Sequence, residues 1–530
     1  MRLAPPAFTA ACTPLPPQRP RHRRRDPEGT VLHQVVRTNL EPFVAHLHRQ
    51  GGSLPDFVVR EFRAFIGCGV LARGFRRLRC RGCGGARLVG FSCGGRTACP
   101  SCGGRRMADL AAHLVDRVLP WAPVRQWVLS LPWNLRLLVA YDHSLLLECH
   151  RALVRSLTTW QRRRARETGI ADARCGAVAQ IQRFSADLSL NPHLHLLAPD
   201  GVFHRPVPEA PPVFHRLPPP TDTEVCSVVE GVARRMHRVL TRRGLDPHDP
   251  RRLQSAAAEL GEQEPALAHL SAAAAQGRLA LGRHAGLRPA ILGAEPRSLV
   301  GSAAPRARTR ARLCAEADGY NLHAAVWVRD DRRDRLEHLA RYLARPPLAN
   351  DRLGLLEDGT VALRLKRPRA SDGATHVLLH PFELLGRIAA LMPRPHLNST
   401  LYSGVLAANA AWRPHVVPPP PSHDARPSRP KPSRRRRRLP WADLLYRVFG
   451  IDALRCDDCG SRYEHIADIR DPEAAAAILR ALGMPDTPLP IVPARPPPDD
   501  DAPDPDPDPA SDHCDDEPAH WEQDEIDWAA

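Results

Sequence analysis

The spacing of apolar residues predicts helices over most of residues 31–65 and again over residues 107–119. In the first segment apolar side chains recur every three or four residues, which places them on one face of a helix. They are Leu40, Phe43, Val44 and Leu47, followed by Phe57, Val58, Phe62 and Phe65. Between the two segments, residues 68–102 are rich in glycine and cysteine and poor in apolar side chains. That stretch cannot form a hydrophobic core, so it must be stabilised by cross-links such as disulfides or a bound metal.

The middle of the chain mixes strands with helices. Apolar runs predict strands at residues 126–131, 176–197 and 322–328, and helical spacing predicts helices at residues 144–166 and 334–345. Pro346 and Pro347 end the last helix, because proline lacks an amide hydrogen and disfavours helix in the residue before it.

Proline clusters near both ends and predicts disordered flanks around an ordered middle. Since the chain has 530 residues, two or more domains are expected. We expect disorder at residues 1–30, a helical and zinc-binding domain at 31–107 and a large central domain at 108–415. After these we expect a Pro/Arg-rich linker at 416–440 and a small unit with a C-x-x-C at 441–490. The end of the chain, residues 491–530, is expected to be an acidic Pro/Asp-rich disordered tail.

The charge balance favours a polyanionic partner. Lys and Arg together number 75 against 58 Asp and Glu, and nearly all of the basic residues are arginine, which pairs bidentately with phosphate. Nucleic acid is therefore favoured over a membrane, although an arginine-rich proteome would give the same bias and the charge alone decides little. No stretch is apolar enough to span a bilayer and no signal peptide is evident, so we expect a cytoplasmic protein.

Six of the 14 cysteines lie within residues 68–102 and predict a zinc module. Cys80-x-x-Cys83 and Cys99-x-x-Cys102 have the spacing of a four-thiolate zinc ribbon, and a chain without an export signal uses such cysteines for metal rather than disulfides. Cys68 and Cys93 are further candidates that can replace a ligand or serve a second site. Arginines surround these cysteines, as in zinc modules that bind nucleic acid, and include Arg73, Arg76, Arg77, Arg79, Arg81, Arg87, Arg96, Arg105 and Arg106.

Another C-x-x-C occurs at Cys456 and Cys459. A zinc site there needs two more ligands, for which His465 and Cys314 are candidates. A pair that stays free or joins two subunits is an equally good interpretation of these two cysteines.

Two histidines, His193 and His195, stand two apart in an apolar run. In a strand they point to the same face and can chelate a divalent metal. Gln182 precedes His193 by eleven residues, so a hairpin can bring it alongside as a third, neutral ligand. Mg²⁺ or Mn²⁺ held there would polarise a phosphate. Taken alone, the two histidines are equally an ordinary strand pair.

A tyrosine on the helix of residues 334–345 offers a nucleophile. The apolar stripe of this helix consists of Leu336, Leu339 and Leu343. Tyr342 lies next to this stripe, and Arg345, three residues later, is on the same helix face as Tyr342. A phenol beside arginines can attack a phosphodiester and form a phosphotyrosine. The alternative is an amphipathic helix residue with its hydroxyl in water, which the neighbouring histidine pair argues against.

Taken in order, these motifs resemble one family. They are the cysteine block of residues 91–102, residues 125–132, His193-Leu194-His195 with residues 200–202, residues 341–348, residues 365–367 and residues 402–405. The chain resembles rolling-circle transposases of the insertion-sequence 91 class, which are HUH (His-hydrophobic-His) endonucleases, over roughly residues 40–415 and less specifically over residues 441–488.

The resemblance implies an α+β fold: an HUH domain, with an antiparallel sheet flanked by helices, after a small zinc-ribbon module. It implies that a metal on His193 and His195, with Gln182 as a weaker third ligand, holds the scissile phosphate of single-stranded DNA. It implies that Tyr342 attacks this phosphate and leaves a 5′-phosphotyrosine and a free 3′-hydroxyl. The expected cofactors are structural Zn²⁺ and catalytic Mg²⁺ or Mn²⁺. The expected DNA-binding residues are Arg341, Arg345, Lys366, Arg367, Arg105 and Arg106.

One departure from the family pattern is the absence of a second tyrosine. Two-tyrosine members carry it four residues from the first, where this chain has His338 and Pro346. We therefore expect a single-tyrosine, common-region-like transposase that acts on single-stranded element ends and target DNA near the bacterial nucleoid, with no membrane or small-molecule substrate. A replication initiator or relaxase with the same chemistry is one alternative. A non-catalytic zinc-ribbon DNA-binding protein is another.

Overall fold

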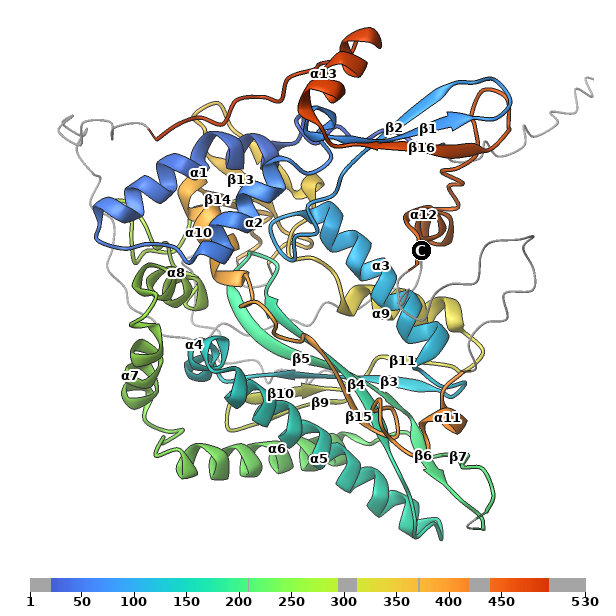
Figure 1. Cartoon of the computed structure of the whole chain (residues 1–530). Coiled ribbons are helices and arrows are strands. Elements are labelled where there is room, and N and C mark those ends of the chain that lie inside the picture. The colour runs from blue at the N-terminus through green and yellow to red at the C-terminus, as the bar shows by residue number, and fades with distance from the viewer. Residues whose placement is uncertain (1–20, 208, 294–311, 370–371, 419–438, 495–530) are drawn as a thin grey trace, which may run out of the picture. The chain divides into compact units, whose positions relative to one another are not determined.

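The computed structural model describes residues 21–207, 209–293, 312–369, 372–418 and 439–494, and Figure 1 shows its elements. These residues form two compact units. The larger unit holds residues 26–70, 92–418 and 487–494, within those described ranges, and the smaller holds residues 21–25, 71–91 and 439–486.

This division differs from the expected domains, because residues 71–91 group with the segment after residue 439 rather than with the rest of residues 31–107. The disorder expected at residues 1–20 and 495–530, and most of the expected linker, lie outside the described residues.

The larger unit is built on an antiparallel sheet in the order β15-β4-β5-β3-β10-β9, with β11 also paired to β3. The strands are β3 (Val124–Ser130), β4 (Gly176–Phe184), β5 (Leu190–Pro199), β9 (Cys314–Ala317), β10 (Tyr320–His323), β11 (Trp327–Val328) and β15 (Thr400–Gly404). The expected strand at residues 322–328 is thus two short strands, and the expected run at 176–197 is the hairpin of β4 and β5. The structure therefore has the mixture of helices and an antiparallel sheet that the sequence predicts.

Helices cover both faces of this sheet (Figure 1). Leu194 and Leu196 of β5 face a core formed with α4 (Trp133–Tyr141), α5 (His143–Glu167), α6 (Asp222–Arg242) and α7 (Pro250–Gly261). Leu197 faces a second core formed with α3 (Pro100–Arg117) and α9 (Arg333–Leu343). Because both faces are covered, every residue of β3 is buried.

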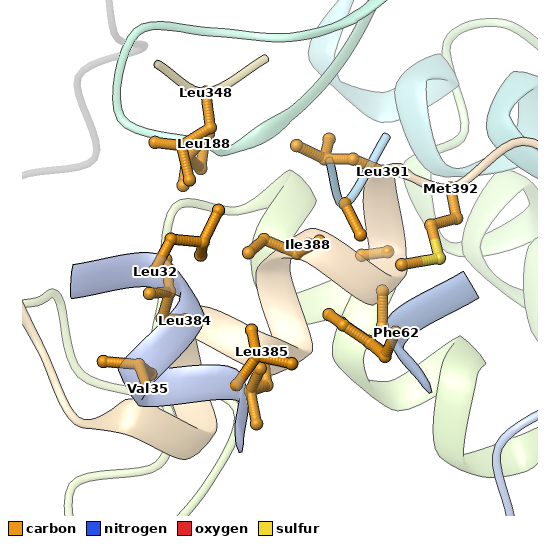
Figure 2. Packing of buried hydrophobic residues seen from close by; sticks show 14 of the residues in the cluster. Leu32, Val35, Phe62, Leu188, Leu348, Leu384, Leu385, Ile388, Leu391 and Met392 are labelled. Atoms are coloured by element: carbon orange, nitrogen blue, oxygen red, sulfur yellow. The ribbon is translucent and has the colours of Figure 1, made fainter. Parts of the chain in front are cut away.

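A third core of the larger unit surrounds α10 (Pro381–Leu391), of which every residue from Glu383 to Leu391 is buried. Figure 2 shows Leu384, Leu385 and Ile388 between side chains of α1 (Val31–Arg49) and α2 (Asp56–Ile66). Gly51, with φ of 77°, lies in the turn that separates α1 from α2, so the helical pattern of residues 31–65 is two helices. The same core includes α8 (Pro265–Ala275) and the sheet β12-β13-β14-β8, with strands β12 (Leu353–Leu355), β13 (Val361–Arg364), β14 (His376–Leu379) and β8 (Ile291–Leu292).

The remaining elements of the larger unit are short. β6 (Gly201–His204) and β7 (Val213–Arg216) pair as a two-stranded sheet, and α11 (Arg413–Val416) follows β15. Asp200 joins this region to the main sheet, because its carboxylate accepts two hydrogen bonds, of 2.9 and 2.8 Å, from the buried guanidinium of Arg125 on β3.

The smaller unit is a three-stranded antiparallel sheet in the order β16-β1-β2, with strands β1 (Phe75–Cys80), β2 (Ala86–Gly90) and β16 (Tyr463–Ile469). The helices α12 (Trp441–Phe449) and α13 (Pro472–Ala481) flank β16 in the chain. Its core is small and consists of Leu71, Phe75, Leu88, Ala475 and Leu479. Among the helices described in both units, none has the length and apolar content needed to cross a membrane.

Candidate functional site

The two histidines lie on the central strand of the large sheet, on the face covered by α3 and α9. On β5, His193 is paired with Gln182 of β4 and His195 is paired with Gln180, so all four side chains emerge on one face. The two imidazole rings are 4.8 Å apart between centroids. The hairpin that the sequence analysis required to bring Gln182 beside His193 is therefore present.

Tyr342 lies over this pair. Its ring centroid is 6.0 Å from that of His195, with the ring planes at 85°. Tyr342 is the second-last residue of α9, and Leu336, Leu339 and Leu343 anchor this helix in the core against α3. The helix pattern of residues 334–345 thus buries its leucine stripe and leaves the tyrosine half-buried at the edge, directed to the histidines.

Gln182 links the histidine strand to the tyrosine helix. Its Nε2 donates to the backbone oxygens of Leu343, at 2.6 Å, and Tyr342, at 3.2 Å, which are among the last carbonyls of α9. These bonds hold the amide nitrogen against α9 and leave the amide oxygen, Oε1, without a hydrogen-bond partner among the described residues. Gln182 therefore has both a positioning role for Tyr342 and an acceptor atom to offer.

Gln126 is a site residue that the sequence analysis did not single out. Its side-chain amide lies 2.7 Å from His195 Nδ1, and it comes from β3, on the other side of β5 from Gln182. His193 is held in the same manner by the backbone oxygen of Asn191, 2.8 Å from its Nδ1. Both imidazoles are thereby oriented through Nδ1. The sequence signals for Gln126 are a polar side chain within an apolar strand and its place in the motif of residues 125–132.

Two buried polar atoms at the centre of the site, His195 Nε2 and Gln182 Oε1, have no hydrogen-bond partner within the described residues. Buried polar groups are nearly always satisfied, so such atoms on neighbouring side chains are the ones that a cation would satisfy. Burial lowers the pKa of His193 to about 4 and that of His195 well below its usual value. Both rings are therefore neutral near pH 7, which is the state that a metal ligand requires.

Cationic side chains surround the tyrosine. The guanidinium carbon of Arg345 lies 4.5 Å from the centre of the Tyr342 ring, and the Lys366 ammonium lies 5.7 Å from it. A pocket next to them is lined by Arg345 and Lys366 together with apolar side chains that include Met107, Phe184 and Pro346. Of the other expected DNA-binding residues, Arg105, Arg106 and Arg367 are exposed and Arg341 is half-buried.

The cysteines form two clusters instead of the single ribbon expected from Cys80, Cys83, Cys99 and Cys102. Cys99 and Cys102 join Cys68 and Cys93 in the larger unit, whereas Cys80 and Cys83 join Cys456 and Cys459 in the smaller one. Within each cluster all four sulfur atoms lie within 4.8 Å of one another. Spacing along the chain reveals pairs, but which pairs meet depends on the fold, so the predicted grouping is wrong.

The first cluster fits a tetrahedral zinc ion. Its sulfur–sulfur separations include 3.5 Å for Cys68–Cys99 and 3.7 Å for Cys68–Cys102, against about 3.8 Å expected when four thiolates bind zinc at about 2.3 Å. The loop before Cys99 is fixed by Glu61, whose carboxylate accepts from the backbone amides of Arg96, Thr97 and Ala98. Cys68 and Cys93, expected only as extra candidates, are full members of this cluster.

Comparisons with known proteins find transposases and a zinc-binding domain. A family described as "Putative transposase" matches residues 176–413, and one described as "Transposase zinc-binding domain" matches residues 36–131. A protein of Pseudomonas savastanoi pv. phaseolicola described as "Transposase for insertion sequence element IS801" is 23% identical over 429 residues, which cover 80% of this chain and 87% of that protein. No solved structure matches the chain.

Proposed function

Because the chain belongs to the insertion-sequence 91 family of transposases, we propose that it cleaves and rejoins single-stranded DNA through a covalent 5′-phosphotyrosine on Tyr342. The observation that carries this proposal is the placement of Tyr342 over His193 and His195, with its ring 6.0 Å from that of His195. The helix that carries Tyr342 packs on the sheet face that carries the two neutral imidazoles, and its buried leucines and Gln182 hold it there.

The donor set suits a divalent cation. His193, His195 and Gln182 would hold Mg²⁺ or Mn²⁺, which supplies Lewis-acid polarisation of the scissile phosphate. The unsatisfied buried atoms His195 Nε2 and Gln182 Oε1 support this assignment. Three protein donors would leave the remaining coordination positions of such an ion for substrate oxygens and water.

In the cleavage step, the phenolic oxygen of Tyr342 attacks the scissile phosphorus. The new bond joins that oxygen to the 5′ phosphate, the bond to the 3′ oxygen breaks, and the departing 3′ oxygen takes up a proton as the phenol loses one. Arg345 and Lys366, over the ring, stabilise the negative charge that develops on the phenolate and the phosphate. In the reverse step an incoming 3′-hydroxyl attacks the phosphotyrosine, and the tyrosine leaves.

Because the site has one tyrosine, the rejoining step needs another nucleophile, a second subunit or a released 3′-hydroxyl. Both family matches are transposase families. Transposition is therefore favoured over plasmid replication, although the two use the same chemistry.

The proposal is tested by incubating the full chain with Mg²⁺ or Mn²⁺ and labelled single-stranded DNA from the ends of its element. We expect a covalent protein–DNA adduct that survives denaturation. Tyr342→Phe should form none, and His195→Ala should form it at least about 100-fold more slowly, because several kcal/mol of charge stabilisation is lost.

Tyr320→Phe is the matched control. Tyr320 lies in the core on the opposite face of the sheet, and its buried hydroxyl has no hydrogen-bond partner among the described residues, so its loss should leave adduct formation unchanged. An adduct formed by Tyr342→Phe would show that another residue is the nucleophile. Binding without cleavage, unaffected by His193→Ala, would indicate a non-catalytic DNA-binding protein. Cleavage at replication origins but not at element ends would indicate an initiator.

A further inference from the structure

The second cysteine cluster is assembled from two Cys-x-x-Cys turns that stand far apart in the chain. Cys80 Sγ lies 3.3 Å from Cys459 Sγ, and Cys83 Sγ lies 3.7 Å from Cys456 Sγ, across a separation of 373 residues in the second case. All four belong to the smaller unit. The family match to a zinc-binding domain ends at residue 131 and therefore includes only the first pair.

The two turns have the same backbone structure. In the first, the Cys80 amide donates to the Gly85 oxygen at 2.8 Å and the Gly84 amide donates to the Cys80 oxygen at 3.1 Å. In the second, the Cys456 amide donates to the Ser461 oxygen at 2.7 Å and the Gly460 amide donates to the Cys456 oxygen at 3.0 Å.

Each turn ends in a glycine with positive φ, 73° at Gly84 and 75° at Gly460. An arginine that precedes each turn, Arg79 or Arg455, lies close to that glycine. Two turns that differ in sequence yet match in geometry are what a shared tetrahedral ion requires of its two halves.

The strands around the cluster place the two turns together. β1 pairs with β16 from Phe75 opposite Ile469 to Cys80 opposite Tyr463, so the strand before the first turn lies beside the strand after the second. Three ion pairs add to this register: Arg76 with Asp468, Arg81 with Glu464 and Arg87 with Asp457. These arginines, expected from the sequence to bind nucleic acid, are paired with carboxylates of the C-terminal segment.

The alternative ligands considered for Cys456 and Cys459 are engaged elsewhere. His465 Nε2 lies 2.9 Å from Asp468 Oδ1. Cys314 belongs to β9 of the larger unit, where its thiol donates to Asn321 Oδ1. Disulfides are also excluded by distance, since the 3.3 and 3.7 Å separations greatly exceed the S–S bond of about 2.05 Å.

We propose that Cys80, Cys83, Cys456 and Cys459 bind one structural Zn²⁺, separate from the ion of the Cys68 cluster, and that this ion holds the C-terminal segment on the β1–β2 hairpin. Four thiolates close the coordination shell and leave no position for substrate, which is the pattern of a structural site. The ion is needed because the hydrophobic cluster of this unit contains only five buried residues, too few to stabilise the unit alone.

The first test is a metal count. The full-length chain, purified without chelator, should contain two zinc ions, and the double variant Cys456→Ser/Cys459→Ser should contain one. The matched control is Cys226→Ser, which removes a cysteine outside both clusters and should retain two. A wild-type chain with one zinc, or a double variant with the same zinc content as the wild type, would overturn the proposal.

The second test follows the C-terminal segment itself and does not depend on a folded variant. A specific protease site is inserted between Arg434 and Arg438 of the full chain, and the cleaved protein is passed over a sizing column. The C-terminal fragment should remain with the rest of the chain in zinc and separate after a strong chelator is added. Co-elution that persists when metal analysis shows no zinc would contradict a metal-held segment, as would separation in the zinc-loaded state.

Discussion

At the scale of residues, the site depends on amide side chains as much as on its histidines. The Gln126 side chain holds His195 and the backbone oxygen of Asn191 holds His193, each through Nδ1, while the Gln182 side chain holds the end of the tyrosine helix. Groups that bond to the far side of a ligand fix its tautomer and ring orientation. The histidine pair that the sequence displays is therefore oriented as a candidate ligand set by partners from β3 and from β5 itself.

We predict that Gln126→Ala lowers the affinity of the site for Mn²⁺ by about 10- to 100-fold, since loss of such an orienting bond has that typical effect. Calorimetric titration with Mn²⁺ of the chain that retains its zinc but is free of Mg²⁺ and Mn²⁺ measures this affinity. Gln180→Ala is the control, because Gln180 is also a buried amide opposite His195 but bonds to Thr400. Equal losses in the two variants would show that Gln126 acts only through folding.

At the scale of elements, the first cysteine cluster supports the tyrosine helix. Cys99 and Cys102 begin α3, and α3 packs beside α9 in a shared core. Gly103, directly after Cys102, lies so close to Pro346 that an added Cβ would stand 2.6 Å from the proline Cβ. Because Pro346 follows the end of α9, the contact joins the cysteine cluster to the position of Tyr342.

We predict that Gly103→Ala destabilises the chain by about 1–3 kcal/mol, as overpacking of a close contact does, and slows adduct formation by displacing the end of α9. Thermal unfolding and the adduct assay measure the two effects. The adjacent Gly104→Ala meets no atom within 4 Å and should be neutral or stabilising by up to about 1 kcal/mol, since alanine favours a helix over glycine. Equal melting temperatures for the two variants would contradict the close contact.

At the scale of the whole molecule, buried histidines make the fold sensitive to acid. Burial lowers the pKa of His150, His193 and His195, so the folded chain keeps these rings neutral where the unfolded chain protonates them. The free energy of unfolding must then fall as the pH drops below the unfolded pKa of about 6.5.

We predict that His150→Gln reduces this acid sensitivity. The pKa of His150 is about 4 in the fold, so its contribution is lost between pH 6.5 and pH 4 and amounts to about 3 kcal/mol at most. Urea unfolding of both proteins at pH 7 and pH 4.5, without added Mg²⁺ or Mn²⁺, gives the change in the free energy of unfolding for each. If the two proteins lose the same stability between these pH values, His150 is protonated in the folded state.

The sequence by itself determined the main elements and the family. The helical spacing predicted α9 and α5, the apolar runs predicted β3 to β5, and the motif order predicted a transposase with a zinc-binding module. These are local properties, set by the period of side chains along a helix or strand and by the residue types that a reaction needs.

Only the tertiary structure decided which distant residues meet. It joined Cys80 and Cys83 to Cys456 and Cys459, left Cys99 and Cys102 to Cys68 and Cys93, and brought Gln126 to His195. Strand pairing and packing bring together residues hundreds of positions apart, and no local pattern records the partner of a strand or of a cysteine pair. The residue types along the chain therefore identify candidate ligands, and the fold decides which of them share a site.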